Sequence, residues 1–337
     1  MSTHKAVQVA SANAPLTVVD VDTVAPPRGH VRIAVAAAGV CGTDHSVVGG
    51  IFPGVRWPVT PGHEIAGTIA EIGDEVTGFA VGDRVEVGWF GGNCNTCVPC
   101  RKGQLIHCEN GQVPSLHYPG GYAESVTVPA TALARIPDGL SFSEAAPMGC
   151  AGVTTFNALR HTKAQPGDRV AVLGVGGLGH LGVQWSRAMG FETIAIARGA
   201  GKEADAKSLG AHHYIDSTAG DVAAALKDLG GVSVVLATAA NSAAMAATVG
   251  GLQPEGELMI IGVTVDPMPI VPVMLIGPGL SVKGHPSGTA RDVEETMAFA
   301  VISGVRARVE ELPLVQAAEA YERMDTGRAR YRMVLTV

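Results

Sequence analysis

The segment Gly174-Val175-Gly176-Gly177-Leu178-Gly179 follows an apolar run, Val170–Leu173, and opens a stretch with helical periodicity. It fits the pattern G-x-G-x-x-G, which is informative in a chain with 44 glycines only because of this strand–turn–helix context. The glycines permit a tight turn, close approach of the backbone to a pyrophosphate, and close packing of helix on strand. Unpaired amides at the helix N-terminus would face the phosphates. The segment therefore predicts a dinucleotide-binding βαβ unit.

The sequence around this turn alternates between apolar strands and helical segments from about Gln165 onward. Such alternation predicts βαβ units and a parallel sheet. The expected helices are Leu178–Met189 and Lys202–Leu209, and a further helix, Arg291–Ile302, precedes a final strand, Arg332–Val337. The expected strands of the parallel sheet are Val170–Leu173, Thr193–Ala197, His213–Ile215, Val232–Ala237, Glu257–Ile261 and Leu280–Lys283.

Residues 1 to about 148 have a different sequence pattern, which is typical of a β-rich domain. Short apolar runs, Val31–Ala38, Ile65–Ile72 and Arg84–Val87, are separated by turns rich in Gly, Pro and Asp. A chain of 337 residues is long enough for two domains, each with its own core.

Composition and charge limit the possible partners. No uncharged apolar run approaches the roughly 20 residues of a membrane span, and the N-terminus does not have the pattern of a signal peptide. A net charge of −7 argues against a general nucleic-acid or anionic-membrane partner. Four of the six cysteines lie between Cys94 and Cys108, which favours metal binding in a reducing compartment over disulfides. We therefore expect a cytoplasmic protein.

The four clustered cysteines are Cys94, Cys97, Cys100 and Cys108, spaced C-x2-C-x2-C-x7-C. One loop with these spacings can place four sulfurs around a tetrahedral zinc ion, which leaves no position for a substrate, so this zinc would be structural. Three alternatives are an iron–sulfur cluster, a disulfide knot and a nucleic-acid-binding zinc ribbon. Only Arg101 and Lys102 lie nearby, which weakens the last of these.

The other two cysteines suggest a second metal site. Cys41 follows an apolar strand, His63 has a carboxylate, Glu64, beside it, and Cys150 follows Met148-Gly149. A lone cysteine in an apolar region is most often a small core residue. Two thiolates and an imidazole, however, are three ligands for zinc, and they leave the fourth position open, as catalytic zinc requires.

The end of the second expected strand bears on the choice of nicotinamide cofactor. NAD binding usually uses an acidic residue roughly 20 residues after the glycine turn. Here Ala197 is followed by Arg198, with Lys202 as a second cation, so a 2′-phosphate would meet positive charge without repulsion. The sequence favours NADP(H). The alternative is that Arg198 is a solvated loop residue and that NAD(H) binds as well.

Together these features resemble the zinc-dependent medium-chain alcohol dehydrogenases. The resemblance covers nearly the whole chain and accounts for all six cysteines. It implies an α/β fold in which a GroES-like β-rich catalytic domain, residues 1–148 completed by 286–337, holds an inserted Rossmann cofactor domain, a doubly wound parallel sheet of residues 149–285. The motifs that carry it occur in this order: Gly39–Asp44 (GVCGTD), Pro61–Glu64 (PGHE), the four-cysteine loop, Cys150–Thr154 (CAGVT) and the glycine turn.

The resemblance also implies roles for individual residues. Cys41, His63 and Cys150 would bind the catalytic zinc, with Glu64 close behind the metal. Asp44 would orient His63, a task that a metal-bound imidazole requires, and Thr43 would take the proton of the substrate hydroxyl. Thr154 and the backbone at Gly262 and Val263 would lie by the nicotinamide, and Arg330 would bind the cofactor phosphates. Trp89 matches an aromatic residue of the substrate pocket, for which Trp57, Phe52 and Met274 are further candidates. The layout resembles members that form homodimers or homotetramers through the cofactor domain.

One position departs from the family's pattern. Many members have a histidine five residues after the first zinc cysteine, which passes the proton to solvent. Ser46 stands there in this chain, and His45 is one residue earlier. We favour Ser46 with water over His45, because a shift of one residue redirects a side chain greatly. Gly42 replaces a larger basic residue found in relatives and removes one contact to the cofactor phosphates.

The predicted activity is reversible hydride transfer between NADP(H) and a primary or aromatic alcohol or aldehyde, through an alkoxide bound to zinc. The apolar pocket candidates favour such substrates over sugars. The alternative enzyme is a polyol or formaldehyde-type zinc dehydrogenase that uses NAD. A non-catalytic cofactor-binding protein is a third possibility, but such a protein is expected to have lost a zinc ligand or Thr43, and this chain retains them all.

Overall fold

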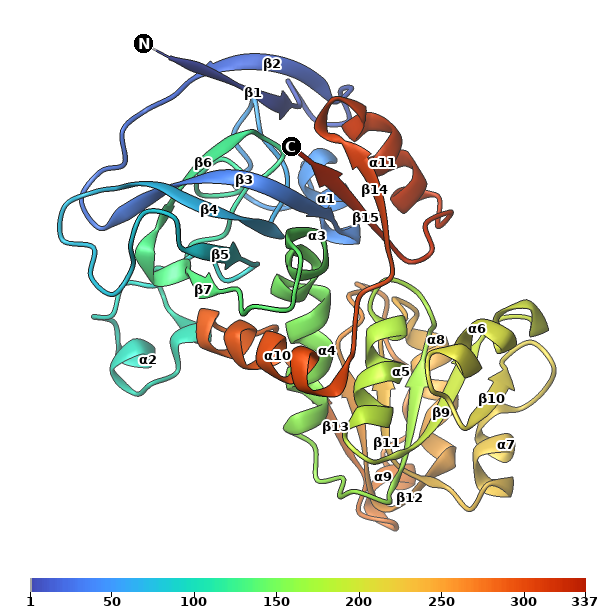
Figure 1. Ribbon diagram of the computed structural model, residues 1–337. Helices are drawn as coiled ribbons and strands as arrows, with labels where there is room; N and C mark the ends of the chain where they lie inside the picture. Colours follow the sequence, from blue (N-terminus) through green and yellow to red (C-terminus); the bar gives the residue numbers. More distant parts are fainter. Residues whose placement is uncertain (1) are drawn as a thin grey trace. The chain divides into compact units, whose positions relative to one another are not determined.

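The second half of the chain forms a six-stranded parallel sheet in the computed structural model, which describes residues 2–337 (Figure 1). The strand order is β10-β9-β8-β11-β12-β13. In order of appearance this is the 3-2-1-4-5-6 order of a doubly wound dinucleotide fold, so the predicted Rossmann sheet is confirmed. The strands are β8 (Arg169–Leu173), β9 (Glu192–Ala197), β10 (His213–Asp216), β11 (Val232–Ala237), β12 (Leu252–Ile260) and β13 (Ser281–Gly284).

Helices connect these strands, as parallel pairing requires. The core of this unit consists of aliphatic side chains from the strands, such as Ile194, Ile196 and Val235, packed against Leu226 and Met245 of two connecting helices. The helices are α5 (Gly179–Ala188), α6 (Glu203–Ser208), α7 (Val222–Asp228), α8 (Ser242–Thr248) and α9 (Val273–Ile276), with the short 3₁₀ turns η4 (Ala200–Lys202) and η5 (Val249–Gly251).

The first part of the chain and the C-terminal part share a seven-stranded sheet (Figure 1). Its order is β14-β15-β3-β4-β5-β7, with β6 paired to β3, and β1 and β2 form a separate hairpin. Apart from the parallel β14–β15 pair, the pairing is antiparallel. The strands are β1 (Thr3–Gln8), β2 (Thr17–Asp22), β3 (His30–Val40), β4 (Ile65–Ile72), β5 (Arg84–Val87), β6 (Ser125–Pro129), β7 (Ala134–Arg135), β14 (Val309–Pro313) and β15 (Arg332–Thr336).

Short helices complete this part. The last strand, β15, lies beside β3, with Met333 opposite Val40, so the C-terminal strand reaches the point where β3 leads into Cys41. The helices are α1 (Gly42–Val48), α2 (Val98–Arg101), α3 (Phe142–Ala145), α10 (Ala290–Ser303) and α11 (Ala317–Asp325), with 3₁₀ turns η1 (Leu105–His107), η2 (Ala130–Ala132), η3 (Ala146–Gly149) and η6 (Leu314–Gln316).

The chain divides into two compact units, Met1–Val153 with Ser287–Val337, and Thr154–Pro286. Helix α4 (Ala151–Arg160) runs from the first unit into the second. In the described part of the chain, residues 2–337, there is no helix whose length and apolar character would let it cross a membrane.

Candidate metal centre and cofactor-binding turn

Asp44 is the centre of a buried hydrogen-bond network at the start of α1. Its side chain is fully buried and accepts three hydrogen bonds. The backbone N–H of Cys41 donates to Oδ2 over 3.0 Å, the Tyr122 hydroxyl donates to Oδ2 over 2.9 Å, and Nδ1 of His63 lies 3.2 Å from Oδ1. This network fixes Cys41 and His63 relative to each other. The structure thus places Asp44 against His63, and its role in orienting a metal-bound imidazole stays a prediction.

His63 and the two cysteines form one group of potential ligand atoms. Cys41, His63, Glu64 and Cys150 each offer an atom, and these atoms lie within 4.8 Å of one another. The Cys41 and Cys150 sulfurs are 3.8 Å apart. Two sulfurs bound to one tetrahedral zinc at about 2.3 Å each are about 3.8 Å apart, so the sulfur pair has the separation that zinc requires. Nε2 of His63 is buried without a hydrogen-bond partner among the described residues, as expected of a ligand atom.

The charges of this group depend on one another. A hydrogen bond from the Cys150 thiol lowers the pKa of Cys41 well below its usual value, and the same bond raises the pKa of Cys150. Burial lowers the pKa of His63, but the Asp44 carboxylate outweighs burial and leaves that pKa well above its usual value. The three side chains are thus electrostatically coupled, and two sulfurs with an imidazole are a donor set suited to a divalent cation such as zinc.

Glu64 is paired with an arginine that the sequence analysis missed. Nη2 of Arg332 lies 2.5 Å from Oε1 and 2.6 Å from Oε2 of Glu64, and both side chains are buried. The signal that could have identified it is a single arginine at the start of the apolar strand β15. Arg330, the predicted phosphate ligand, is exposed, and its backbone N–H donates to Glu310. Its role on the cofactor phosphates stays a prediction.

Aromatic side chains lie beside the ligand group. The Trp89 ring meets the His63 ring edge-on with centroids 5.1 Å apart, and Phe52 lies 5.7 Å from Trp89. Phe52 and Trp57 both pack against an apolar cluster of Val9, Val47, Val48 and Val59. Of the predicted pocket residues, Trp89 is therefore in contact with His63, and Phe52 is in contact with Trp89. Met274 belongs to the second unit, on α9, and is 41% exposed.

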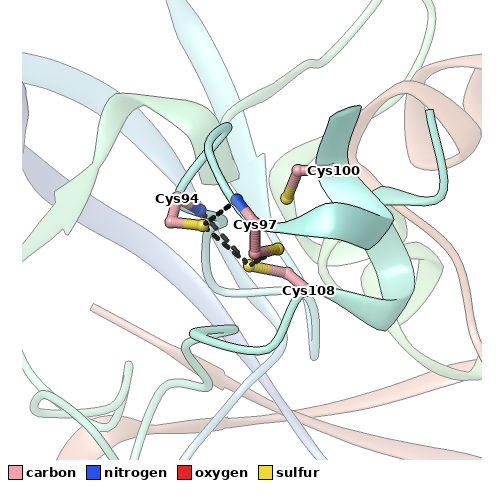
Figure 2. Close-up of side chains that lie close together, drawn as sticks. All are labelled: Cys94, Cys97, Cys100 and Cys108. Carbon is pink, nitrogen blue, oxygen red and sulfur yellow. Dashed lines mark hydrogen bonds between the residues drawn. The ribbon is translucent and has the colours of Figure 1, made fainter. Parts of the chain in front are cut away.

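The remaining four cysteines form the second potential metal group (Figure 2). The Cys108 sulfur lies 3.6 Å from that of Cys94 and 3.8 Å from that of Cys97, and Cys100 faces the same space from α2. Hydrogen bonds from the Thr96 hydroxyl and the Asn110 amide lower the pKa of Cys94 to about 5. All six cysteines are free, which excludes the disulfide alternative, and the spacings fit one tetrahedral zinc.

Two protein families match the chain, and together the matches span most of it. Residues 27–138 match the alcohol dehydrogenase GroES-like domain, and residues 177–301 match the zinc-binding dehydrogenase family. The alcohol dehydrogenase patD of Penicillium expansum is 39% identical over 336 residues, which cover 100% of this chain and 98% of that protein. An alcohol dehydrogenase of Geobacillus stearothermophilus is 37% identical, with 99% of both chains covered. The crystal structure of the alcohol dehydrogenase from Aeropyrum pernix superimposes with a TM-score of 0.89 at 31% identity, covering 99% of this chain and 100% of that one.

The chain belongs to the zinc-dependent medium-chain alcohol dehydrogenases. The predicted GroES-like and Rossmann folds are thereby confirmed. The description of the second family, zinc-binding dehydrogenase, fits a chain that has two groups of potential metal ligands.

The glycine turn has the geometry that a nucleotide-binding dehydrogenase needs. Gly174 has φ +96°, in the region that favours glycine, and a Cβ on Gly179 would lie 1.7 Å from the carbonyl oxygen of Gly174. A Cβ on Gly176, in contrast, would point into open space. The turn therefore has a free backbone surface where a pyrophosphate can approach, and it leads directly through Leu178 into α5.

The loop after β9 carries the residues predicted to select the dehydrogenase cofactor. The Arg198 side chain is exposed, whereas Nζ of Lys202 donates to the carbonyl of Val175 over 3.0 Å. Gly199 is held on both sides by β10, because its N–H donates to Asp216 over 2.7 Å and its carbonyl accepts from the Tyr214 hydroxyl over 2.6 Å. These two β10 residues were missed by the sequence analysis, since nothing in the local pattern pairs them with Gly199.

Other predicted cofactor residues occupy separate places in the fold. Gly262 follows β12, where a Cβ would lie 2.5 Å from the Ala239 carbonyl, and the next residue, Val263, is 85% exposed. Thr154 lies on α4 and is 9% exposed, and Thr43 and Ser46 lie half-buried on α1. Their roles in the dehydrogenase reaction stay predictions.

Proposed function

We propose that this chain is an alcohol dehydrogenase and aldehyde reductase that transfers a hydride between NADP(H) and a primary or aromatic alcohol or aldehyde. The observation that carries the proposal is the group of Cys41, His63 and Cys150, in which the two sulfurs are 3.8 Å apart and Nε2 of His63 is directed to the group without another partner among the described residues. The group lies in the unit Met1–Val153 with Ser287–Val337, which acts as the catalytic domain, and the unit Thr154–Pro286 binds the cofactor.

Zinc held by these three ligands supplies a Lewis acid that makes a substrate hydroxyl more acidic or polarises a carbonyl. The chain's own residues do the rest. Asp44 holds the imidazole of His63 through Nδ1, so that Nε2 keeps its lone pair for the metal. Thr43 takes the hydroxyl proton and Ser46 passes it to water. The substrate carbon transfers a hydrogen nucleus with two electrons, as hydride, to NADP⁺. The alcohol thereby becomes an aldehyde, and the proton of its hydroxyl group reaches solvent.

The aromatic side chains near His63 support an apolar substrate. Trp89 contacts His63, Phe52 contacts Trp89, and Trp57 packs against the same apolar cluster as Phe52. Aromatic surfaces favour a phenyl or alkyl group over the hydroxyls of a sugar, which would lose hydrogen bonds to water there. We therefore assign primary aliphatic and aromatic alcohols as the substrate class.

The second unit supplies the cofactor contacts. Gly174, Gly176, Gly177, Leu178 and Gly179 bind the pyrophosphate, and Arg198, with Lys202 as a second cation, binds the 2′-phosphate. The exposed guanidinium of Arg198 supports this assignment, since an arginine recognises phosphate with two hydrogen bonds. Thr154, Gly262 and Val263 lie by the nicotinamide, and Arg330 on the phosphates.

The direct test measures hydride transfer with a panel of substrates. Ethanol, hexanol, benzyl alcohol and sorbitol are assayed with NADP⁺ or NAD⁺, and formaldehyde is assayed with NADPH or NADH. We expect the highest kcat/KM for benzyl alcohol or hexanol with NADP⁺. Absence of hydride transfer with every substrate would contradict the enzyme. Equal or better turnover with NAD⁺ would contradict the cofactor choice, and preference for sorbitol or formaldehyde would support the polyol or formaldehyde-type alternative.

We also propose that copies of this chain associate through the second unit as a homodimer or homotetramer. Strand β13 is the last strand of its sheet, and the segment before it exposes a series of large apolar side chains. These include Val265 (98% exposed), Val273 (69%) and Ile276 (76%). An unpaired edge next to an apolar surface is a site where a second copy can extend the sheet.

Light scattering of purified variants tests the association. Val265→Asp and Ile276→Asp are expected to lower the molecular mass to that of one chain or of a smaller oligomer. Ile302→Asp is the matched control, because Ile302 is 82% exposed on α10 of the first unit. A wild-type protein that is already monomeric, or variants with unchanged mass, would contradict the proposal.

A further inference from the structure

Glu86 is a buried carboxyl group for which the catalytic scheme has no use. Its side chain is fully buried, and neither Oε1 nor Oε2 has a hydrogen-bond partner in residues 2–337. Burying a carboxyl group without hydrogen bonds costs free energy, which an apolar side chain at this position would avoid. Its oxygens are not part of the group of potential ligand atoms formed by Cys41, His63, Glu64 and Cys150.

The strand geometry determines which way Glu86 faces. Successive side chains of β5 point to opposite faces of the sheet. Val85 and Val87 are fully buried in the apolar core of the first unit, so Glu86 and Gly88 face the other way. On that side they meet the turn η3, which ends at Gly149, the residue before Cys150.

The contact with Gly149 is close. A Cβ placed on Gly149 would lie 1.6 Å from Oε1 and 2.4 Å from Cδ of Glu86, so the carboxyl group occupies the space that any side chain there would need. A Cβ on Gly88 would lie 2.0 Å from the carbonyl oxygen of Gly149. The N–H of Trp89 is directed at the same carbonyl, with a nitrogen–oxygen distance of 3.4 Å. One side of Gly149 is thus covered by the carboxyl group, and its carbonyl lies against Gly88 and Trp89.

We propose that Glu86 is a positioning residue for the zinc ligand Cys150: its carboxyl group packs on Gly149 and holds the backbone from which the Cys150 sulfur reaches the metal. The inference rests on the proposed three-ligand zinc site. The separation of the Cys41 and Cys150 sulfurs, 3.8 Å, is what this packing preserves. Removal of the carboxyl group frees the Gly149 backbone to shift, and a misplacement of a ligand by a fraction of an ångström weakens metal binding.

Four variants of the full-length protein test this role by zinc content after timed dialysis against pyridine-2,6-dicarboxylate. The wild type is expected to hold two zinc ions, with the ion of the four-cysteine loop as an internal reference. Glu86→Gln keeps the shape of the side chain and is expected to retain both ions. Glu86→Ala is expected to release one ion at least about tenfold faster, the scale seen when outer partners of metal ligands are removed. Gly149→Ala is expected to lose that ion, because its Cβ meets the carboxyl group.

The double variant Glu86→Ala/Gly149→Ala is the decisive member of the set. Without the carboxyl group the new Cβ has room, so zinc retention is expected to recover to at least the level of Glu86→Ala. Glu257→Ala is the matched control, because Glu257 is 6% exposed with Oε2 unpartnered, but lies on β12 of the second unit. It is expected to keep both ions.

Cobalt substitution gives a second readout, since thiolate-to-cobalt absorption reports on the sulfurs themselves. Loss of this absorption in Glu86→Ala, with Glu86→Gln unchanged, supports the proposal. Wild-type retention in Glu86→Ala, or a double variant as depleted as Gly149→Ala, would overturn it. If Gly149→Ala fails to fold, the comparison of Glu86→Ala with Glu86→Gln still tests whether Glu86 positions Cys150. A wild type with a single zinc that Cys150→Ser does not remove would show that the three-ligand site itself is wrong, and the inference would fall with it.

Discussion

Nη2 of Arg332 lies 2.5 Å from Oε1 of Glu64, although 268 residues separate them in sequence. Both side chains are buried, and Glu64 follows the metal ligand His63 directly. Burial raises the pKa of Glu64 to about 7 against the lowering effect of the Arg332 charge. The last strand of the chain therefore supplies the charge that balances a buried carboxylate next to the proposed catalytic zinc.

Replacement of Arg332 by alanine is expected to destabilise the protein in a pH-dependent manner. Loss of one partner of a buried ion pair typically costs about 3–5 kcal/mol. Because the folded-state pKa of Glu64 is raised from 4.5 to about 7, this group favours the folded state at low pH, and the benefit is lost as pH rises through that window. Without Arg332 the pKa rises further. Thermal unfolding should thus show a larger loss at about pH 8.5 than at about pH 5.5.

Arg323→Ala provides the control for this measurement. Arg323 pairs with Glu319 on the surface, with side chains 36% and 47% exposed, and its loss should cost at most about 1 kcal/mol. Equal destabilisation of Arg332→Ala at both pH values would contradict the coupling between Arg332 and the ionisation of Glu64.

Asp44→Asn is expected to weaken zinc binding at the three-ligand site by about 10–100-fold. The carboxylate accepts from Cys41, Tyr122 and His63, and an amide cannot accept all three hydrogen bonds. Competition with a chelator measures the effect. Asp83→Asn is the control, because Asp83 accepts a hydrogen bond from Ala80 in an exposed turn. A wild-type zinc affinity in Asp44→Asn would show that Asp44 does not orient the imidazole.

The parallel sheet was predictable because its strands are continuous apolar runs. In this sheet the bounds expected for β11 agree with the structure, β8, β9, β10 and β13 differ by a residue at their ends, and β12 begins at Leu252 instead of the expected Glu257. In the other sheet the bounds expected for β4 and β5 also agree. Helices α7, α8 and α11 were not predicted. The first two are rich in alanine, VAAALKD and SAAMAAT, so they show only a weak contrast between apolar and polar faces. Helix α11, AAEAYERMD, has distinct apolar and charged faces, so its sequence did carry a helical signal.

At the candidate metal centre, the cysteines and the histidine that the structure brings together were predictable from specific motifs, but the residues around them were not. Tyr122, Glu86 and Arg332 come from the segment before β6, from β5 and from β15, in that order, and only the sheet pairing brings these segments together. A buried arginine or glutamate in a strand looks like a surface residue in a sequence, because its partner is far away in the chain.

His45→Ala is expected to leave kcat within about tenfold of the wild type with zinc intact. Nδ1 of His45 lies 2.8 Å from Asp325 of α11, and the side chain is 52% exposed, so it is already engaged outside the ligand group. Ser46→Ala should lower kcat more, because we assign proton transfer to Ser46. Steady-state kinetics with a matched zinc assay compare the two. A larger loss in His45→Ala than in Ser46→Ala would reverse the assignment.

Arg198→Ala is expected to raise the KM for NADPH by about 10–100-fold, the equivalent of one or two charged hydrogen bonds. The KM for NADH should change little, since NADH has no 2′-phosphate. Lys227→Ala, at the end of α7, serves as a charge-matched control. An unchanged KM for NADPH in Arg198→Ala would mean that the guanidinium is a solvated loop residue.

The proposed hydride transfer depends on zinc bound by Cys41, His63 and Cys150. The most direct measurement of this dependence is zinc per chain together with hydride transfer in Cys150→Ser. The wild type should contain two zinc ions and reduce NADP⁺ with an alcohol. Cys150→Ser should retain one ion in the four-cysteine loop, remain folded, and lose hydride transfer by at least about a thousandfold. A Cys150→Ser protein that keeps two zinc ions, or that still oxidises alcohols at the wild-type rate, would contradict the account.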